Sequence, residues 1–350
     1  MKIAVLHGSM TDLAPLDEQD GLIQVEAVSR ALLDLGHEPV QMSFSLDVQK
    51  SIHDFRRIQP DIVFNLVETI DGQGRLIHLP PSVMESMSLA YTGASTDAMF
   101  TTSNKVIAKK MLMGAGIPTP AFVTADTFSR KYNMEAIPCI IKSVWEHGSV
   151  GLDGDCVIFV NTADQLNQKM DALRNRLGGE CFAESFIDGR EFNLSLISEN
   201  GNGSVQILPP AEIRFVDYPE EKRQIVDYQA KWNDDSFEYH HTVRSFRFED
   251  SDRLLLGKMK NIARECWKLF GLRGYARVDF RVDSDGHPWV LEVNANPCIS
   301  PDSGFVAAAD RAGFTFTHIV ERIIDGPFYT HQMISGKKSN EESWKIAVNQ

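Results

Sequence analysis

The stretch YARVDFRVDSDGHPWVLEVNANP, residues 275–297, holds the side chains of this sequence that are best spaced for chemistry. Two apolar runs flank an Asp-Gly turn, which predicts a β-hairpin. Because side chains alternate along a strand, Arg277 and Asp279 share one face of the first run, and Glu292 and Asn294 share one face of the second. Carboxylate and amide oxygens are the ligands that Mg²⁺ prefers, and the arginine suits an anion bound at such a metal.

The same hairpin has two simpler interpretations. A polar hairpin face is most often a solvated face. Gly286 and Glu292 also stand at the spacing of the glycine and the last glutamate of an EF-hand calcium loop. However, the first ligand position would be Arg281, a cation, and Pro288 and the strand-like flanks do not fit helix–loop–helix. The residues therefore disfavour a calcium loop, whereas the interpretation of this polar face as a solvated face remains possible from the sequence.

The first hundred residues predict the elements before this hairpin. Residues 2–8 form an apolar run ending in glycine, apolar residues recur at helical spacing over 21–35 before Gly36, and residues 60–67 form a second apolar run. This order predicts an α/β unit with a parallel sheet. No GxGxxG follows the first run, which disfavours a nicotinamide enzyme.

The middle and the end of the chain predict further elements. A helix is expected from after Ser103 to Gly114 or Gly116, where the Pro-x-Pro of IPTP stops it. The other expected elements are strand, glycine-rich loop and strand over 137–160, two short strands around an Asp-Gly turn over 181–197, an irregular polar segment over 201–250, an amphipathic helix over 252–270, a last helix after the hairpin, and a disordered or surface tail from about 334.

Composition excludes several classes of protein. The chain has 350 residues, 43% of them apolar, with a net charge of −13 and no basic stripe, so we expect no nucleic-acid partner. No window approaches the length of an apolar membrane span, and the N-terminal apolar run is too short for a secretory signal. Five scattered cysteines without a CxxC predict neither a disulfide framework nor zinc. We therefore expect a cytoplasmic protein with reduced thiols.

The segment GYARVDFRVDSDGHPWVLEVNANPCISPDSGF resembles the metal-binding core of the ATP-grasp enzymes, specifically the D-alanine–D-alanine ligase family. Further segments agree with that family in the same order: DIVFNL, YTGASTDAMFTTSNKVIAKKMLMGAGIPTP, IIKSVWEHGSVGL, AESFIDGREF and DYQAKW. The resemblance covers roughly residues 1–328. It implies an α/β (α+β) ATP-grasp fold: a Rossmann-like parallel-sheet domain at 1–104, a central subdomain at 105–190 and a C-terminal subdomain at 191–333 that clasp ATP, then a polar tail at 334–350.

The resemblance also implies a role for each matching residue. Asp279, Glu292 and Asn294 would hold two Mg²⁺ ions, with Mn²⁺ as an alternative. Arg277 would hold the transferred phosphoryl group or an oxyanion, and Lys231 would reach the phosphates from a mobile loop. The other ATP contacts would come from Lys105, Lys142, Ser149, Val150, Gly151, Glu184, Ser185, Phe186, Ile187 and Glu191.

Enzymes of this kind join a carboxylate to an amine. Phosphoryl transfer to the carboxylate gives an acyl phosphate, whose phosphate is a good leaving group when the amine attacks. Metals and cations offset the charge in both steps. The resemblance thus implies small-molecule carboxylate and amine substrates, and a homodimer through the first domain, as is frequent in the family.

The substrate-binding positions are less well matched. Ser303 keeps the serine that binds the carboxylate of the second substrate. Glu68 stands near the place of a family histidine. The glutamate that binds the first amino group aligns only loosely, so either Asp17 or Glu18 is expected to serve.

Three departures point to other substrates than two D-alanines. Gly148 replaces a serine that hydrogen-bonds a tyrosine of the mobile loop, Trp232 replaces that tyrosine, and Gly304 replaces a leucine. The two glycines suggest a roomier pocket, and Trp232 either stacks on an acceptor or packs the loop. Two other functions stay open: an inactive ATP-binding regulatory or partner-binding module, and a phosphotransferase that stops at a phosphorylated product.

Overall fold

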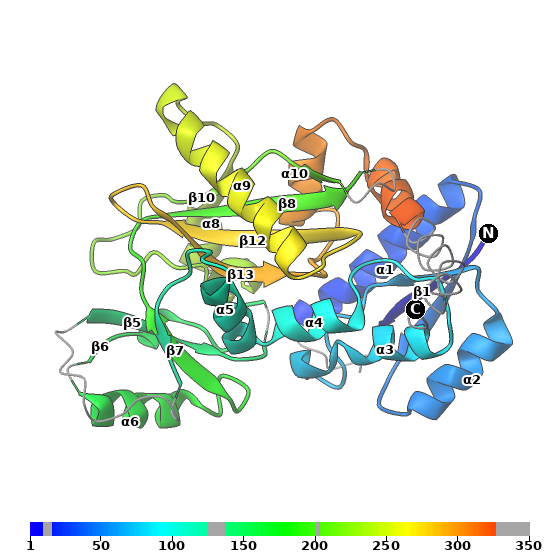
Figure 1. Cartoon of the computed structure of the whole chain (residues 1–350), viewed down its shortest axis with the longest axis horizontal. Coiled ribbons are helices and arrows are strands. Elements are labelled where there is room, and N and C mark those ends of the chain that lie inside the picture. The colour runs from blue at the N-terminus through cyan, green and yellow to red at the C-terminus, as the bar shows by residue number, and fades with distance from the viewer. Residues whose placement is uncertain (10–15, 125–136, 147, 161, 200–203, 327–350) are drawn as a thin grey trace, which may run out of the picture.

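The computed structural model describes residues 1–9, 16–124, 137–146, 148–160, 162–199 and 204–326. The predicted polar tail at 334–350 lies outside these residues. In the described residues, three β-sheets follow one another along the chain (Figure 1): one in the N-terminal part, one in the middle, and a last one that contains the hairpin. None of the helices in the described ranges is long and apolar enough to cross a membrane.

The N-terminal part is a three-stranded parallel sheet in the order β2-β1-β3. Its elements are β1 (Lys2–Gly8), α1 (Leu16–Asp34), β2 (Glu38–Phe44), α2 (Val48–Ile58) and β3 (Ile62–Asn65). Strand β1 is apolar on both faces because both faces are covered: Ile3 and Val5 pack with α1, and Ala4 and Leu6 pack with α2. The predicted parallel α/β unit is confirmed.

A run of short helices leads from this sheet to the rest of the chain. It comprises η1 (Gly74–Leu76), α3 (Leu79–Ser86), α4 (Thr96–Ser103) and α5 (Lys105–Gly114). Asn104 ends α4 and caps α5, since its Oδ1 accepts the Ile107 N–H at 2.9 Å. The helix predicted after Ser103 is confirmed. Helix α4 was not predicted, because its sequence TDAMFTTS is rich in weak helix formers.

The second sheet is antiparallel, in the order β4-β7-β5-β6. Its elements are β4 (Phe122–Val123), β5 (Ile137–Ser143), η2 (Gly154–Cys156), β6 (Val157–Val160), α6 (Ala163–Leu173) and β7 (Cys181–Ser185). Leu166 and Met170 of α6 pack on Ile141 and Ala183 of the sheet. The predicted strand, loop and strand over 137–160 are thereby confirmed.

The third sheet has six strands in the order β11-β10-β8-β12-β13, with β9 paired to β8. The strands are β8 (Arg190–Ser198), β9 (Val205–Ile207), β10 (Ala211–Phe215), β11 (Thr242–Ser245), β12 (Tyr275–Val282) and β13 (Pro288–Asn294). The helices are α7 (Tyr228–Trp232), α8 (Phe237–His241), η3 (Asp250–Asp252), α9 (Arg253–Leu269) and α10 (Gly304–Arg311). The hairpin, the amphipathic helix α9 and the last helix are confirmed.

One further expectation is confirmed and one needs correction. Strands β7 and β8 are the two strands predicted around the Asp-Gly turn, and each of them joins a different sheet. Gly189 makes this crossing feasible: its φ is +145°, and a Cβ there would lie 2.1 Å from the Val282 carbonyl oxygen. The segment 201–250 is not irregular, since it forms β9, β10, β11, α7 and α8. These elements are short, and their alternating polar residues gave little apolar signal.

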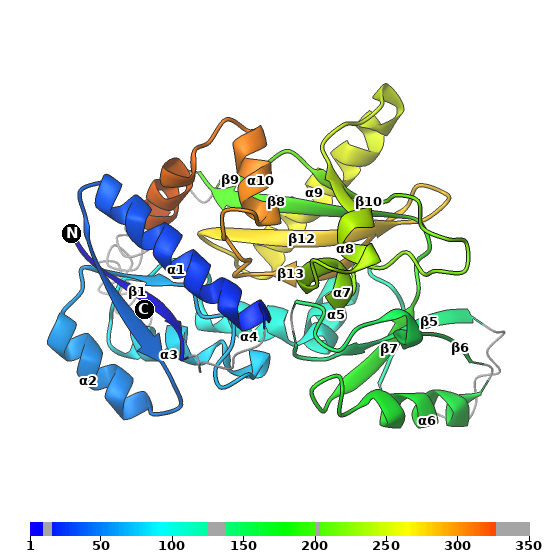
Figure 2. The same cartoon turned by 180° about the vertical axis from the view of Figure 1, so that it is seen from behind.

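The back view shows how the N-terminal sheet meets the largest sheet (Figure 2). Helix α1 runs from the outer edge toward the middle of the molecule, and in this view its first turn lies toward α7. Val28 and Leu32 of α1 share one core with Phe305 of α10 and with Ile319 and Ile323. The predicted domain boundary at 104 falls between the first two sheets, and the one at 190 falls at the first residue of β8. Both boundaries stay predictions.

Candidate active site

The hairpin presents its polar face to a cavity. Strands β12 and β13 pair antiparallel, so that Arg277 lies opposite Asn294 and Asp279 opposite Glu292. All four line a cavity of about 530 Å³ between the four-stranded and six-stranded sheets. The other face, with Val278 on β12, is buried in the core. The simple solvated-face interpretation is therefore wrong, because this face is enclosed by a second sheet.

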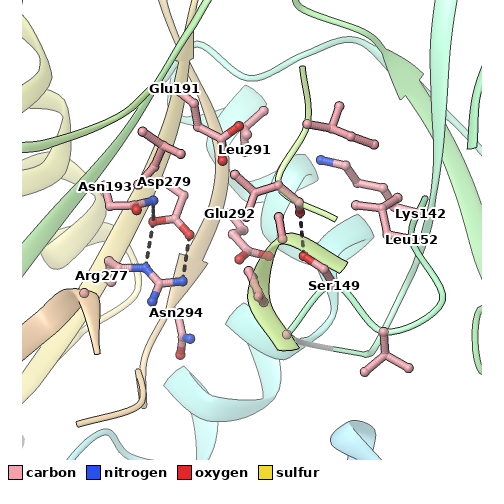
Figure 3. Close-up of a pocket in the computed structure, with 18 of the residues that line it drawn as sticks. Lys142, Ser149, Leu152, Glu191, Asn193, Arg277, Asp279, Leu291, Glu292 and Asn294 are labelled. Atoms are coloured by element: carbon pink, nitrogen blue, oxygen red, sulfur yellow. Dashed lines mark hydrogen bonds and ion pairs between the residues drawn. The ribbon is translucent and has the colours of Figure 1, made fainter. Parts of the chain in front are cut away.

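Asp279 is held by two neighbours (Figure 3). Arg277 approaches it with two nitrogens, Nε at 2.8 Å and Nη2 at 2.9 Å, and Asn193 Nδ2 donates to it at 2.7 Å. Burial lowers the pKa of Arg277, but Asp279 outweighs this and raises it overall. Asn193 was missed by sequence reasoning, although it stands two residues after Glu191 on β8 and in register with Asp279.

Three oxygen-bearing side chains of the hairpin open onto this cavity: Asp279, Glu292 and Asn294. In Figure 3 Glu292 lies between the hairpin residues and Lys142, which comes from the facing sheet. Two carboxylates and an amide fit a hard cation that keeps some water and shares phosphate oxygens. The donor set is thus compatible with Mg²⁺.

Glu184 on β7 lies between two lysines. Its carboxylate is 2.7 Å from Lys142 Nζ and 2.5 Å from Lys109 Nζ, and Glu184 and Lys109 are each only 1% exposed. Burial alone would raise the pKa of Glu184, but the two ammonium groups outweigh it and lower the pKa. Lys109, which also donates to Thr119 Oγ1, was missed because one lysine on a helix gives no distinctive signal.

Lys105 enters the cavity from the first turn of α5. Its Nζ donates to the Glu146 carbonyl at 2.6 Å and lies 3.9 Å from Glu292. Burial lowers the pKa of Lys105, and Glu292 partly opposes this shift. Lys105 and Lys142 thus come from different elements, α5 and β5, to one cavity wall.

The connection after β7 forms another part of the wall, with Ser185, Phe186 and Ile187 lining it. The N–H groups of Ser185 and Phe186 donate to the carbonyls of Ala121 and Pro138. Glu191 on β8 accepts from Arg281 Nε at 3.0 Å. Arg281 also donates to the carbonyls of Ile187, Gly189 and Gln224, so it links this connection to the segment before α7. Sequence reasoning named Arg281 only as an obstacle to calcium.

The glycine-rich loop meets the segment that carries Lys231. Ser149 Oγ donates to the Val226 carbonyl at 2.8 Å, and Trp232 Nε1 donates to the Gly148 carbonyl at 3.0 Å. Ser149 and Val150 line the cavity, as does Lys231, whose pKa is lowered by burial and then by Arg277. Gly151 packs elsewhere, since a Cβ there would lie 2.2 Å from the Arg176 carbonyl oxygen.

The two glycine replacements do not leave empty space. A Cβ at Gly148 would lie 3.7 Å from Trp232 Nε1, and one at Gly304 would lie 3.5 Å from Arg244 Nη2. Both distances are ordinary contacts, so each glycine leaves room beside a larger side chain of the cavity lining. The expected roomier pocket stays a prediction. Of the two roles expected for Trp232, the structure shows the contact with the glycine-rich loop, through the hydrogen bond to the Gly148 carbonyl.

The end of the cavity near α10 carries the other substrate candidates. Ser303 caps α10, since its Oγ accepts the Val306 N–H at 3.3 Å, and it lines the cavity. Glu68 also lines it and accepts from Gln24 at 2.7 Å. The side chains of Asp17 and Glu18, in the first turn of α1, lie outside the described residues.

Asp20, one turn further along α1, lines the cavity and was missed. Cys298 Sγ donates to Asp20 Oδ2 at 2.9 Å. Burial raises the pKa of the Cys298 thiol, and the nearby Glu68 and Asp20 raise it further, which keeps the thiol protonated. The loose resemblance of this segment to the family named Asp17 and Glu18 and gave no signal for Asp20.

Known proteins resemble the chain over most of its length. The family model described as "D-ala D-ala ligase C-terminus" matches residues 111–325. An uncharacterised protein, y4sG, of Sinorhizobium fredii is 29% identical over 86% of both chains. The D-alanine–D-alanine ligase of Moorella thermoacetica is 29% identical over 93% of this chain and 98% of its own.

Solved structures agree on the fold. The D-alanine–D-alanine ligase of Bacillus anthracis complexed with ATP superposes with a TM-score of 0.68 at 19% identity, over 95% of this chain and 99% of that one. The family match covers more than half of the chain and includes the hairpin, the glycine-rich loop and α10. The chain therefore belongs to the D-alanine–D-alanine ligase family of ATP-grasp enzymes, which form carbon–nitrogen bonds.

Proposed function

We propose that this enzyme joins a small carboxylate to a small amine at the expense of ATP, through an acyl phosphate, and that its substrates are not two D-alanines. One observation carries the proposal: Asp279, Glu292 and Asn294 on one hairpin face Lys105 and Lys142 across a single cavity. Oxygen ligands opposite two lysines, one buried and one half-buried, suit the phosphates of a nucleotide with its metal.

The hairpin residues Asp279, Glu292 and Asn294 would hold two Mg²⁺ ions, or Mn²⁺ in their place. Bound there, the ions would neutralise phosphate charge. Arg277, now paired with Asp279, would turn to the transferred phosphoryl group or to the oxyanion formed when the amine attacks.

The rest of the nucleotide would lie toward the four-stranded sheet. Lys105, Lys142 and Lys231 would neutralise its phosphates, and the backbone N–H groups of Ser149, Val150 and Gly151 would approach them. Glu184, Glu191 and the connection Ser185–Ile187 would bind adenine and ribose. The contact between Trp232 and Gly148 would keep this loop closed and water away from the acyl phosphate.

The substrate end supports a change of substrate. Ser303 would hold the carboxylate of the amine substrate. An acid of α1 would hold an amino group of the other substrate: Asp17 and Glu18 remain candidates, and Asp20 is favoured because it lines the cavity. Glu68, Trp232 and Gly304 differ from the family residues that surround two D-alanines.

The test is phosphate release that depends on ATP and Mg²⁺, measured against amino acids and other carboxylates, alone and in pairs, with mass detection. We expect release only with a pair, together with a new amide. A product of two D-alanines made as fast as any other would contradict the altered specificity. Release with a phosphorylated product but no amide would instead identify a phosphotransferase.

An inactive ATP-binding module would bind ATP tightly and release no phosphate with any pair. The intact donor set on the hairpin argues against this function, since a binding module has no need of it. A homodimer through the N-terminal part and a cytoplasmic location stay predictions, which sedimentation and cell fractionation would test.

A further inference from the structure

One cation of the cavity has neither a carboxylate partner nor a proposed role. Six cationic side chains line the cavity: Lys105, Lys142, Lys231, Arg244, Arg277 and Arg281. Four of them lie within 4.0 Å of a carboxylate, namely that of Glu292, Glu184, Asp279 or Glu191. Within the described part of the chain, Lys231 and Arg244 have no such partner. Lys231 already serves the phosphates in the proposed function, which leaves Arg244.

Arg244 lies at the substrate end of the cavity. It extends from β11 toward the start of α10, where its Nη1 is 3.5 Å from the Asp302 carbonyl oxygen. Its Nη2 and Nε would be 3.5 and 3.6 Å from a Cβ at Gly304. A Cβ at position 304 would thus be in ordinary contact with the guanidinium, and the longer side chain of a leucine would compete with it for the adjoining space. Gly304 therefore leaves room beside Arg244, as Gly148 does beside Trp232.

The charges around Arg244 favour a bound anion. Arg244 is an exposed residue of β11 whose guanidinium reaches the cavity lining. Desolvation of this guanidinium lowers the pKa of Arg244, and the nearby Arg277 lowers it further, with only Asp302 opposing. The Asp302 carboxylate already accepts a hydrogen bond from Ser300 Oγ at 3.0 Å. A guanidinium beside a second guanidinium is stabilised by an anion, and its planar fork suits a carboxylate.

We propose that Arg244 is a specificity-determining residue that binds a second anionic group of the amine substrate, beyond the carboxylate assigned to Ser303. The inference rests on the proposed function. The substrate class is an α-amino acid with an acidic side chain, or an amine of the same charge and size. A neutral amino acid such as alanine would leave Arg244 without a partner.

The test compares acids with their neutral isosteres. Aspartate and glutamate, as both enantiomers, are offered as amine substrates beside asparagine and glutamine, and kcat/KM for amide formation is measured. We expect the preferred acid to exceed its amide by about 10- to 100-fold, the range for hydrogen bonds to a charged group. R244Q should remove this preference by slowing the acid alone, and G304L should reduce it by displacing the guanidinium.

The matched control is R247Q. Arg247 is an exposed arginine three residues further on that does not line the cavity, so the same loss of charge there should leave the preference unchanged. Equal kcat/KM for acids and amides in the wild-type enzyme would overturn the inference and leave the ligase function intact. So would a preference that R244Q preserves.

A binding measurement separates the two failures. If no pair gives an amide, the proposed function fails. Calorimetry in the presence of a non-hydrolysable ATP analogue and Mg²⁺ then still tests whether Arg244 binds the acidic group, by comparing the binding of each acid with that of its amide. Aspartate or glutamate binding about tenfold or more tighter than its amide, and only with Arg244 present, supports the inference. Equal binding of acid and amide, or the same binding by R244Q, overturns it.

Discussion

The two ends of the cavity are built differently. At the nucleotide end, Asp279, Glu292, Lys142 and Glu184 stand on strands, and their charges are compensated by partners on the same or another element. At the substrate end, Ser303 and Trp232 stand at the termini of short helices. The resemblance predicts family residues at the strand positions and at Ser303, and it predicts departures at Trp232 and Gly304.

The difference teaches how specificity changes on a constant fold. A charge on a paired strand cannot move without breaking the sheet, and its loss would leave a buried partner uncompensated. Contacts between loops tolerate exchange when the volumes stay complementary. We propose that Gly148 with Trp232, and Gly304 with Arg244, are such exchanges, since each glycine is in ordinary contact with the larger side chain. On this proposal, the site changes while the fold stays the same.

The largest expected effect is the loss of activity on removing a charged oxygen ligand at the nucleotide end of the cavity. E292Q should lower ATP- and Mg²⁺-dependent phosphate release by about a thousandfold, because the lost charge acts on the reacting phosphates. Initial rates at saturating ATP measure this. D285N likewise replaces a carboxylate by an amide, on the exposed turn of the hairpin, and should leave phosphate release unchanged. A loss below tenfold in E292Q would contradict the assigned metal site.

The next largest effect should come from Lys109, at the nucleotide end but outside the cavity lining. K109M should lower the free energy of unfolding by about 3 kcal/mol, since it leaves the buried Glu184 with one ammonium partner fewer. Urea denaturation measures the change. K110M, at the exposed neighbour on α5, should stay within about 0.5 kcal/mol of wild type. Equal effects of the two variants would show that the buried pair is unimportant for stability.

A smaller effect is expected at the substrate end. W232F keeps the ring but loses the N–H that donates to the Gly148 carbonyl. One such hydrogen bond contributes about 1 kcal/mol, so kcat/KM should fall roughly fivefold. W289F removes a comparable indole donor, which contacts Asp283 away from the cavity, and should leave kcat/KM unchanged. An unchanged rate in W232F would mean that this contact does not close the loop.

The smallest expected effect is on the free energy of unfolding at acidic pH. The folded state lowers the pKa of Glu184 below its usual 4.5, so its stabilising contribution is present above that pH and is lost as the pH falls through the folded value. Lys109 and Lys142 stay protonated in this range and add no slope. The unfolding free energy of the wild type should thus decline below about pH 4.5 more steeply than that of E184Q. Parallel curves would contradict the lowered pKa.

Local patterns were enough to predict part of this protein. The alternation of side chains placed Arg277 and Asp279 on one face of the hairpin, and the helix predicted after Ser103 begins at Lys105 in the structure. The apolar run at 2–8 predicted the central parallel strand. These predictions succeeded because periodicity and capping depend on neighbours within a few residues.

Only the tertiary structure decided which residues meet across elements. Sequence alone did not show that Asn193 would face Asp279, that Lys109 would pair with Glu184, or that Arg281 would hold Glu191. It also did not show that β7 and β8 join different sheets, or that Arg244 lies beside Gly304. These contacts depend on strand register and on the packing of distant segments, and no local pattern encodes either of them.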